Sequence, residues 1–377
     1  MNRRIRVAFV HDSYPEYRRP LIARLMKRYD LRCFFLNEDA AGLPPGSVSL
    51  RAWRIPEMSD FVFAPLLEGA ILDAHKHTPF DVVLCPEPAF FSALAAGRAA
   101  RRIRRPYVVF SGEWYTARHP RRMLTRRLER TLVQKAACCL AYGSRVRERL
   151  IGWDVDPNRI LITGNASPYA FTPAVGKELK RIRREWQIGK LPVVLFLGRL
   201  LSFKAPEVLV DAFSVLHRDI PSFLLIAGDG PLREKLRQRV RYLEMDDALV
   251  TGRAVQGSRE KDLLYSLASV FVLPSRAGRI AEPWGLVLNE AASAGLPIVT
   301  TDEVGAAGDL IRDGDTGRIV TGGDPQALAE AIAVLLRSPE TAHAFAARAK
   351  TQAASFTVER MADAFGEAFE RAVGGEG

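Results

Sequence analysis

Two glutamates lie eight positions apart in the segment EPWGLVLNEAASAG, which covers residues 282–295. Glu282 precedes a Trp-Gly step, and Glu290 lies in an apolar stretch that predicts a short helix. The first backbone N–H groups of that helix, at Gly285 and Leu286, have no partner within the helix and attract anions. A carboxylate next to a phosphate would repel it. We therefore interpret the two carboxylates as hydroxyl-binding groups on either side of a phosphate site.

This segment resembles the signature of the retaining nucleotide-sugar glycosyltransferases of family 4, which have the GT-B fold. Their pattern is a Glu, seven residues and a second Glu, with an aromatic-Gly step after the first. The resemblance extends through most of the second half of the chain, in the segments FLGRLLSFK (196–204), LLIAGDGPL (224–232), VFVLPS (270–275) and 295–317. Several matching segments in the same order are specific, whereas a lone pair of glutamates at this spacing would carry little weight.

The resemblance implies a role for each residue that matches the family's motifs. Arg199 and Lys204, which follow an apolar run at 192–197, would bind the donor diphosphate. Glu290 would bind the ribose hydroxyls, and Glu282 would lie at the transferred sugar and take part in catalysis. The other residues expected at the nucleotide are Gly228, Val255, Trp284, Gly285 and Leu286. Of these, Trp284 could either pack beneath its loop or stack on the base, and we expect it to pack beneath the loop.

Two departures from the family pattern lie beside these residues. The family usually has Gly after the Lys, whereas here Ala205 and Pro206 follow Lys204. Proline is unstrained at the first position of a helix, so we expect Pro206 to begin one. The run Arg276–Ala281 is longer than usual, which affects the predicted shape of the loop and not the identification of Glu282.

The first half of the chain contributes fewer recognisable residues. Related enzymes place a His or an acidic residue near the reacting sugar, in the loop after the strand expected at 107–110. Glu113 and His119 are the candidates for catalysis here, and each could instead be a loop residue that only makes hydrogen bonds. The segment 11–18, after the first expected strand, lacks the pair of glycines frequent in the family, so we assign no contact to it.

Sugar transfer requires stabilisation of a departing diphosphate, either by fixed cations or by a divalent metal. The chain contains two Asp-x-Asp segments of the kind that bind metals in other transferases, at 154–156 and 313–315. Both lie among Gly, Pro, Asn and Asp residues that favour turns. We therefore expect no metal and no other cofactor, with Arg199 and Lys204 supplying the positive charge.

Apolar runs typical of strands alternate with amphipathic stretches along the chain, which predicts an α/β protein with parallel sheets. By resemblance, we expect a GT-B fold with two Rossmann-like domains facing a cleft and a C-terminal helix that crosses back to the first domain. The expected parts are an acceptor-binding domain (1–168), a linker (169–190), a nucleotide-sugar-binding domain (191–355) and the crossover helix (356–377). In the second domain the informative loops all follow strands, so they should meet at one edge of its sheet.

Positive charge is concentrated in the first half. Residues 1–184 contain 33 Lys and Arg against 17 Asp and Glu, a net charge of +16, whereas residues 185–377 carry −5. This asymmetry indicates an anionic partner for the first half. The segment 121–135 places five arginines around Leu124, Leu128 and Leu132, which suits either an anionic membrane surface or a helix packed on the sheet with a solvated face. No nucleic-acid-binding module accompanies it, so we expect no nucleic-acid partner.

Length and composition are those of a soluble globular protein with two domains. The 377 residues are 48% hydrophobic and 26% charged, and no apolar run approaches the roughly 18–20 residues of a membrane span. The apolar run Val7–Val10 after the basic start is too short for a signal peptide and predicts a strand. Cys33, Cys85, Cys138 and Cys139 lack metal-ligand spacing and indicate buried, reduced thiols, which favours a cytoplasmic protein.

Together these features predict a retaining, metal-independent hexosyltransferase, peripheral on the cytoplasmic face of a membrane. It would move a sugar from a nucleoside-diphosphate sugar to a glycan or lipid-linked acceptor in cell-envelope polysaccharide or glycolipid assembly. Two other classes remain open: a GT-B sugar-nucleotide epimerase or hydrolase, and a non-catalytic nucleotide-binding protein. The intact set of Arg199, Lys204, Glu282 and Glu290 argues against the last. The donor sugar, its base and the acceptor stay unassigned.

Overall fold

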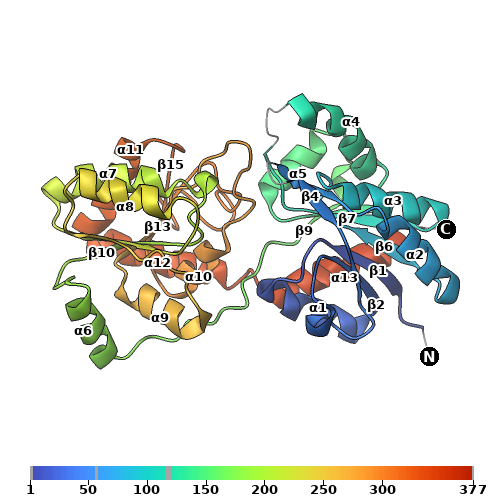
Figure 1. The fold of residues 1–377 in the computed structure, drawn as a ribbon, viewed down its shortest axis with the longest axis horizontal. Coiled ribbons are helices and arrows are strands. Elements are labelled where there is room, and N and C mark those ends of the chain that lie inside the picture. The colour runs from blue at the N-terminus through green and yellow to red at the C-terminus, as the bar shows by residue number, and fades with distance from the viewer. Residues whose placement is uncertain (1–2, 56–57, 116–119, 376–377) are drawn as a thin grey trace. The chain divides into compact units, whose positions relative to one another are not determined.

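The computed structural model describes residues 3–55, 58–115 and 120–375. The chain divides into two compact α/β units (Figure 1). The first unit comprises Met1–Ala166 and Thr357–Gly377, and the second comprises Ser167–Phe356. Residues 169–190, expected to form a linker, belong to the second unit and contain helix α6 (Gly176–Glu185).

Seven parallel strands form the sheet of the first unit, in the order β3-β2-β1-β6-β7-β8-β9. They are β1 (Arg6–His11), β2 (Asp30–Leu36), β3 (Val48–Leu50), β6 (Val82–Cys85), β7 (Tyr107–Ser111), β8 (Cys138–Ala141) and β9 (Ile160–Ile162). The side chains of β1 alternate between two hydrophobic cores, one on each face of the sheet. Ala8 and Val10 belong to one core, and Val7 and Phe9 belong to the other. Burial on both faces explains why these strands are continuously apolar in sequence.

Within the described residues of this unit, six helices cover the two faces of the sheet. They are α1 (Arg19–Arg28), α2 (Leu67–His77), α3 (Phe91–Arg102), α4 (Pro120–Gln134), α5 (Ser144–Ile151) and α13 (Val358–Gly374). The last helix, α13, carries a buried stripe that includes Met361, Phe365 and Phe369, and the ring of Phe365 lies 4.8 Å from that of Phe110. The prediction that the C-terminal helix returns to the first domain is therefore confirmed.

Three short strands were absent from the sequence-based prediction. One is β3, which adds only three residues to the edge of the sheet next to β2. The others, β4 (Trp53–Ile55) and β5 (Met58–Phe63), form a separate antiparallel pair with an irregular register. β3 and β4 have three residues each, which is too few for an alternating pattern to appear, whereas the six residues of β5 include the polar pair Ser59 and Asp60, which interrupts its apolar run.

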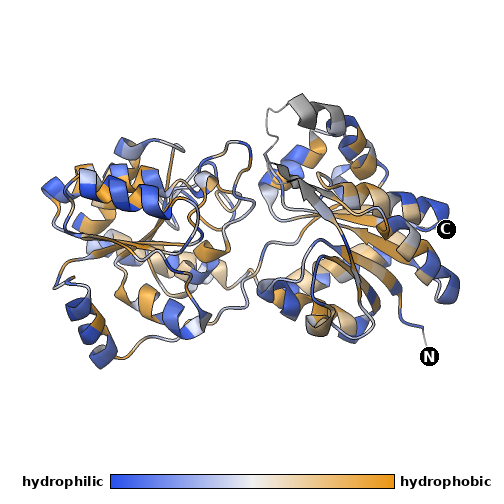
Figure 2. Cartoon of the chain, in the orientation of Figure 1, coloured by the Kyte–Doolittle hydropathy of each residue, from blue (hydrophilic) through white to orange (hydrophobic). Residues whose placement is uncertain are grey.

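Six parallel strands form the sheet of the second unit, in the order β12-β11-β10-β13-β14-β15. They are β10 (Val193–Leu197), β11 (Phe223–Ala227), β12 (Ala248–Val250), β13 (Val270–Leu273), β14 (Ile298–Thr301) and β15 (Arg318–Val320). The helices besides α6 are α7 (Pro206–Asp219), α8 (Arg233–Tyr242), α9 (Gly257–Leu267), α10 (Leu286–Ser293), α11 (Pro325–Arg337) and α12 (Pro339–Ala353). In each unit the apolar strands lie between helices whose polar residues face outward (Figure 2). Parallel strands end at the same edge, and that edge carries the candidate site.

Candidate functional site

The loops that follow the strands of the second sheet are joined by hydrogen bonds between their backbones. Leu200 N–H donates to the Asp229 carbonyl (2.8 Å), and Arg276 N–H donates to the Phe203 carbonyl (2.8 Å). Gly305 N–H in turn donates to the carbonyl of Glu282 (3.0 Å). The prediction that these loops meet at one edge of the sheet is confirmed, and the edge holds its shape through main-chain contacts.

Two glycines allow the ends of β10 and β11 to approach each other closely. Gly228 has φ +147°, and a Cβ there would overlap the carbonyl oxygen of Gly198. Its N–H also donates to Thr251 Oγ1 (3.2 Å). Gly228, predicted to lie at the nucleotide, therefore has a structural reason to be glycine that is independent of any ligand.

Gly228→Ala should lower the free energy of unfolding by about 2 kcal/mol, because the new methyl group meets backbone and the φ angle is strained for an L residue. Gly176→Ala is the matched control, since nothing lies within 4 Å of a Cβ at Gly176. Chemical denaturation of both variants checks this. Equal stability of the two variants would contradict the close packing of Gly228.

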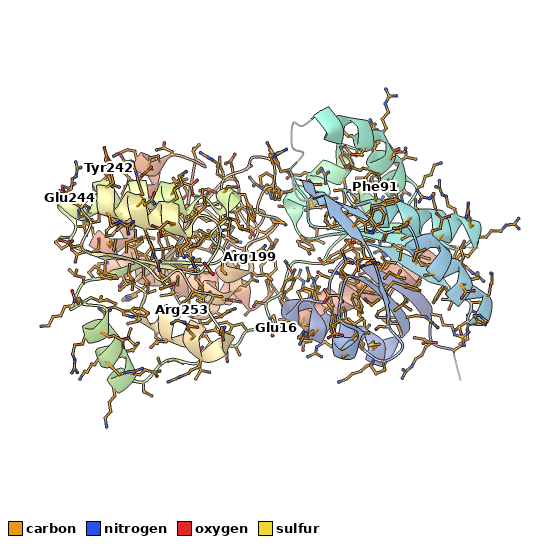
Figure 3. The ribbon with its side chains drawn as sticks, in the orientation of Figure 1. Glu16, Phe91, Arg199, Tyr242, Glu244 and Arg253 are labelled. Atoms are coloured by element: carbon orange, nitrogen blue, oxygen red, sulfur yellow. The ribbon has the colours of Figure 1, made fainter. Side chains whose placement is uncertain are left out.

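Lys204 and Glu282 form an ion pair at this edge. The Nζ of Lys204 lies 2.5 Å from Oε2 of Glu282, and the two side chains are only 12% and 10% exposed. Arg199 is exposed on the turn after β10 and makes no ion pair within the described part of the chain (Figure 3). The structure thus brings together two residues predicted for the site, Lys204 and Glu282, and places Arg199 on the same loop as Lys204. It also shows a direct Lys–Glu contact that the sequence did not predict.

Pro206 begins α7, as predicted, and the residue before it explains the family's usual glycine. Ala205 adopts a left-handed conformation with φ +46°, ψ +45°. This conformation costs a residue with a Cβ about 1–2 kcal/mol, and glycine avoids that cost. The departure from the family pattern therefore affects backbone strain at Ala205 and leaves the helix start unchanged.

The run Arg276–Ala281 is tied back to its neighbours. Ala277 N–H donates to Glu303 Oε2 (3.0 Å), and Gly278 N–H donates to the Ile280 carbonyl (3.2 Å). The extra residues of this run form a small turn of their own. Glu282, which follows them, still lies beside Lys204.

Trp284 and Gly285 shape the start of α10. The indole of Trp284 is 1% exposed, and its Nε1–H donates to Asn289 Oδ1 (2.8 Å). The ring packs beneath the loop, as expected, so stacking of a base on it would require the loop to move. Gly285 has φ +88° and caps the helix, which leaves its own N–H and that of Leu286 at the helix N-terminus. Leu286 is partly exposed there.

Glu290 lies in the second turn of α10, and the described residues surround it with donors. Lys261 Nζ lies 2.8 Å from Oε1 and 3.0 Å from Oε2. Tyr265 donates to Oε2 (2.9 Å) and Ser167 to Oε1 (3.1 Å). Burial beside the Glu290 carboxylate raises the pKa of the Tyr265 hydroxyl well above its usual value, so it stays a donor. A carboxylate has about four lone-pair positions, so a ligand hydroxyl would have to replace one of these donors.

Val255 lies on the loop between β12 and α9. It is partly exposed. The next residue, Gln256, donates its N–H to Glu260 Oε2 (2.7 Å), which caps the start of α9. The loop therefore presents its backbone at the same edge of the sheet as the other candidate residues.

In the first unit, Glu113 follows β7 at the carboxyl edge of the sheet. Its Oε2 accepts from Arg149 Nη2 (3.1 Å), and its carbonyl accepts from Arg149 Nη1 (2.6 Å). The other candidate, His119, lies outside the described residues. In the loop after β1, Arg18 is fully buried, and its guanidinium donates to Asn165 Oδ1 (3.0 Å) and to the hydroxyl of Tyr142. The sequence assigned no contact to the segment 11–18. In the structure, its residue Arg18 binds side chains that follow β8 and β9 at the carboxyl edge of the sheet.

Both Asp-x-Asp segments serve turns, as expected. Asp156 Oδ1 accepts from Asn158 N–H (2.9 Å) at a short 3-10 helix. Asp313 Oδ1 accepts from Ile319 N–H (2.9 Å), and Asp315 pairs with Arg348 (2.8 Å). Among the described residues, no group of three or more His, Cys, Asp or Glu side chains could hold a metal ion.

The four cysteines are free and buried, as predicted. Burial raises the pKa of the Cys33 thiol to about 12 and that of the Cys138 thiol to about 11. At neutral pH they are therefore thiols with no nucleophilic character.

The basic helix α4 presents charge and one apolar residue to solvent. Arg126 and Arg127 are exposed, and Arg130 pairs with Asp154. Leu132 is buried, whereas Leu128 is 52% exposed; the side chain of Leu124 lies outside the described ones. Within the described parts, no helix has both the length and the apolar character to cross a bilayer.

Three further residues at the two sheet edges were not found from the sequence. Lys261 and Tyr265, on α9, contact Glu290, and Glu87 contacts the loop that carries Glu113. The only signal for Glu87 was an acidic residue between two prolines directly after an apolar run. Lys261 and Tyr265 follow ordinary helical spacing and gave no signal.

Two family models match the chain. The model described as "Glycosyl transferases group 1" matches residues 179–352, within the second unit. The model described as "Glycosyl transferase 4-like domain" matches residues 16–166, within the first.

Two curated proteins resemble parts of the chain. GDP-mannose-dependent alpha-(1-6)-phosphatidylinositol monomannoside mannosyltransferase of Mycolicibacterium smegmatis is 34% identical over 168 residues, which are 44% of this chain and 44% of that protein. D-inositol 3-phosphate glycosyltransferase of Corynebacterium urealyticum is 32% identical over 221 residues, 56% of this chain and 51% of that protein. The chain thus matches about half the length of these relatives.

Solved structures share the fold over almost the whole chain. Anabaena Alr3699/HepE in complex with UDP superposes with a TM-score of 0.76 at 18% identity, covering 96% of this chain and 99% of that one. Sucrose-phosphate synthase from Thermosynechococcus elongatus superposes with a TM-score of 0.73 at 18% identity, covering 99% of this chain and 100% of that one. At this identity the likeness concerns the fold alone.

Proposed function

Since the chain belongs to the group 1 glycosyltransferases and has the GT-B fold, we propose that it transfers a sugar from a nucleoside-diphosphate sugar to a glycan or lipid-linked acceptor. The anomeric configuration is retained. We place the reaction in the assembly of a cell-envelope polysaccharide or glycolipid.

The observation that carries the proposal is the Lys204–Glu282 pair, with the exposed Arg199 on the same loop as Lys204 and the N-terminus of α10 shortly after Glu282 in the chain. Two cations and the first helix amides can hold a leaving diphosphate. A largely buried carboxylate next to them can accept hydrogen bonds from sugar hydroxyls. When the diphosphate arrives, Lys204 can interact with both groups, so the pair keeps Lys204 oriented in the absence of donor.

Retention follows if the acceptor hydroxyl attacks from the face that the leaving group vacates. An oxygen of the departing diphosphate then takes the acceptor proton, while Arg199, Lys204 and the amides of Gly285 and Leu286 stabilise the negative charge. No separate base on the opposite face is needed. Glu113 in the first unit is proposed to contact the acceptor or the reacting sugar, and His119 is a second candidate for the same role.

The proposed role of Glu290 is to bind the ribose hydroxyls in exchange for one of its present donors. Glu290→Gln should raise the Kd for the nucleoside diphosphate about tenfold and leave kcat nearly unchanged, because a ribose contact is made both before and during the reaction. Gln keeps an acceptor for Tyr265, so the fold should survive. Isothermal titration with UDP and GDP checks the affinity, with Glu330→Gln on the exposed face of α11 as the control. A loss confined to kcat would contradict this role.

We also propose docking of the first unit on an anionic membrane surface. The exposed arginines of α4 and the exposed Leu128 among them support it. The name of one relative includes a phosphatidylinositol glycolipid, which is consistent with an acceptor held at a bilayer.

The proposal is tested by measuring turnover of UDP-, GDP-, ADP- and dTDP-sugars, with and without acceptors, in the presence and absence of EDTA. The acceptors are D-inositol 3-phosphate, phosphatidylinositol and a bacterial lipid-linked glycan extract. Acceptor-dependent formation of an α-linked product from an α-linked donor, unaffected by EDTA, is the expected result. Release of free sugar or epimer alone would indicate a hydrolase or epimerase. Binding without turnover of any donor would indicate a nucleotide-binding protein, and activity restored only by Mg²⁺ or Mn²⁺ would reject metal independence.

A further inference from the structure

The loop after β7 is held between two side chains at the carboxyl edge of the first sheet. The segment 111–113 comprises Ser111, the last residue of β7, and Gly112 and Glu113, the first two residues of this loop. On one side, Gly112 is pressed against the ring of Tyr142, so that a Cβ at Gly112 would lie 2.5 Å from Tyr142 Cε2. The hydroxyl of Tyr142 is itself held by the buried guanidinium of Arg18. The loop therefore cannot move toward β8 without displacing a buried network.

On the other side, the loop is held by Glu87, which follows β6. Its Oε2 accepts the N–H groups of Gly112 (2.8 Å) and Glu113 (3.1 Å). The hydroxyl of Ser111 donates to Oε1 (2.9 Å). One partly buried carboxylate thus receives donors from three consecutive residues, including two adjacent backbone amides that no strand or helix satisfies. Hydrogen bonds to an ionised carboxylate are roughly twice as strong as those between neutral groups.

The charges around Glu87 come from every element packed on the loop. Glu113 contributes a second carboxylate, and Arg149 of α5 bonds to Glu113 and lies 3.9 Å from the buried Glu129 of α4. Tyr142, directly after β8, is neutral, since burial raises its pKa to about 12. Burial, and then the charge of Glu113, raise the pKa of Glu87 to about 7. Glu87 therefore gains a proton as the pH falls through neutrality, and its hydrogen bonds to the loop then weaken, because a neutral carboxyl is a weaker acceptor than a carboxylate.

We propose that Glu87 is a positioning residue for the transfer reaction: its carboxylate clamps residues 111–113 against Tyr142 and so presents Glu113, paired with Arg149, to the acceptor. The inference rests on the proposed transferase function for what the loop contacts. The clamp itself rests on the hydrogen bonds alone. Glu87 touches no donor group in this role, so donor binding does not depend on it.

Two variants separate geometry from charge. In Glu87→Gln the amide oxygen can still accept the two backbone N–H groups and the amide NH₂ can donate to Ser111, whereas Glu87→Ala removes all three contacts. Glu68→Ala is the control, because Glu68 is likewise a partly buried carboxylate of the same unit, paired with Arg98 and Arg102 on the adjacent helix. Amide hydrogen exchange of peptides covering 107–115 is measured for all of them without substrate. Donor affinity is measured by titration with UDP and GDP.

The expected result is exchange at Gly112 and Glu113 at least tenfold faster in Glu87→Ala, near wild type in Glu68→Ala, and intermediate in Glu87→Gln, whose neutral amide forms the same bonds more weakly. Donor affinity should be unchanged in all three. With an acceptor that supports turnover, kcat of the wild type should rise as the pH increases through about 7, because ionised Glu87 holds the loop more strongly than the protonated acid does. Glu87→Gln should lack this rise, and Glu87→Ala should lose about tenfold in kcat.

Unchanged exchange in Glu87→Ala would overturn the clamp. A pH profile identical in wild type and Glu87→Gln would overturn the role in transfer. If no acceptor supports turnover while the exchange result holds, the proposed function fails and the clamp stands.

Discussion

Replacing Lys204 with alanine is expected to lower kcat roughly 10²–10³-fold, the scale for removing one preorganised charged partner of a developing anion. Lys204 lies beside Glu282 at the carboxyl edge of the second sheet, and its side chain is largely shielded from solvent. Water in the variant would therefore stabilise the diphosphate charge much less than the ammonium group does. Arg199→Ala should cause a loss on the same scale. Both losses should appear in kcat with any donor the enzyme accepts.

Lys204→Ala also removes the buried ion pair with Glu282, so stability must be measured beside activity. Lys204→Arg keeps the charge and should retain far more activity than the alanine variant. Lys235→Ala removes an exposed lysine from α8 of the same unit and serves as the control. Near-wild-type kinetics of both Lys204→Ala and Arg199→Ala would contradict the assignment of these cations to the diphosphate.

The sequence predicted the features that depend on buried apolar strands. Runs such as Val7–Val10 and 192–197 are apolar because both faces of each sheet are covered, so periodicity located nearly all the long strands and their order along the chain. Because parallel strands end together, the loops carrying Arg199, Lys204 and Glu282 could be placed at one edge before any contact was known.

The features that the sequence did not predict depend on single contacts. Glu87 and Lys261 acquire their importance from groups distant in sequence, at Gly112 and Glu290. No local pattern distinguishes Lys261, and the two prolines that flank Glu87 do not indicate its partners. The left-handed conformation of Ala205 was also not predicted, because a proline that begins a helix does not reveal the φ angle of the residue before it. Short strands such as β3 lack the length for a pattern.

The basic helix α4 gives the second large expected effect, on membrane binding. Each arginine near an anionic surface contributes about 1 kcal/mol. Arg126 and Arg127 are exposed, and Arg130 adds less because it is paired with Asp154. The structure does not describe the side chains of the segment's other arginines, including Arg122. The substitutions are therefore made at Arg126, Arg127 and Arg130. Removing about 2–3 kcal/mol corresponds to a roughly 30- to 150-fold weaker partition onto vesicles.

The triple variant Arg126→Gln, Arg127→Gln, Arg130→Gln should therefore remain in the supernatant when vesicles containing phosphatidylglycerol are sedimented, whereas the wild type should pellet. Binding of the wild type should weaken steeply with salt, since surface charge is screened over about 10 Å at 0.1 M. Arg239→Gln, Arg241→Gln removes two exposed charges from α8 of the second unit and should leave sedimentation unchanged, which distinguishes a local face from net charge. Turnover of a donor in the absence of vesicles should be unaffected in both, because none of these residues lies at the donor site. Equal binding of the wild type to neutral and anionic vesicles, or a triple variant that still pellets, would show that α4 is only a solvated helix face.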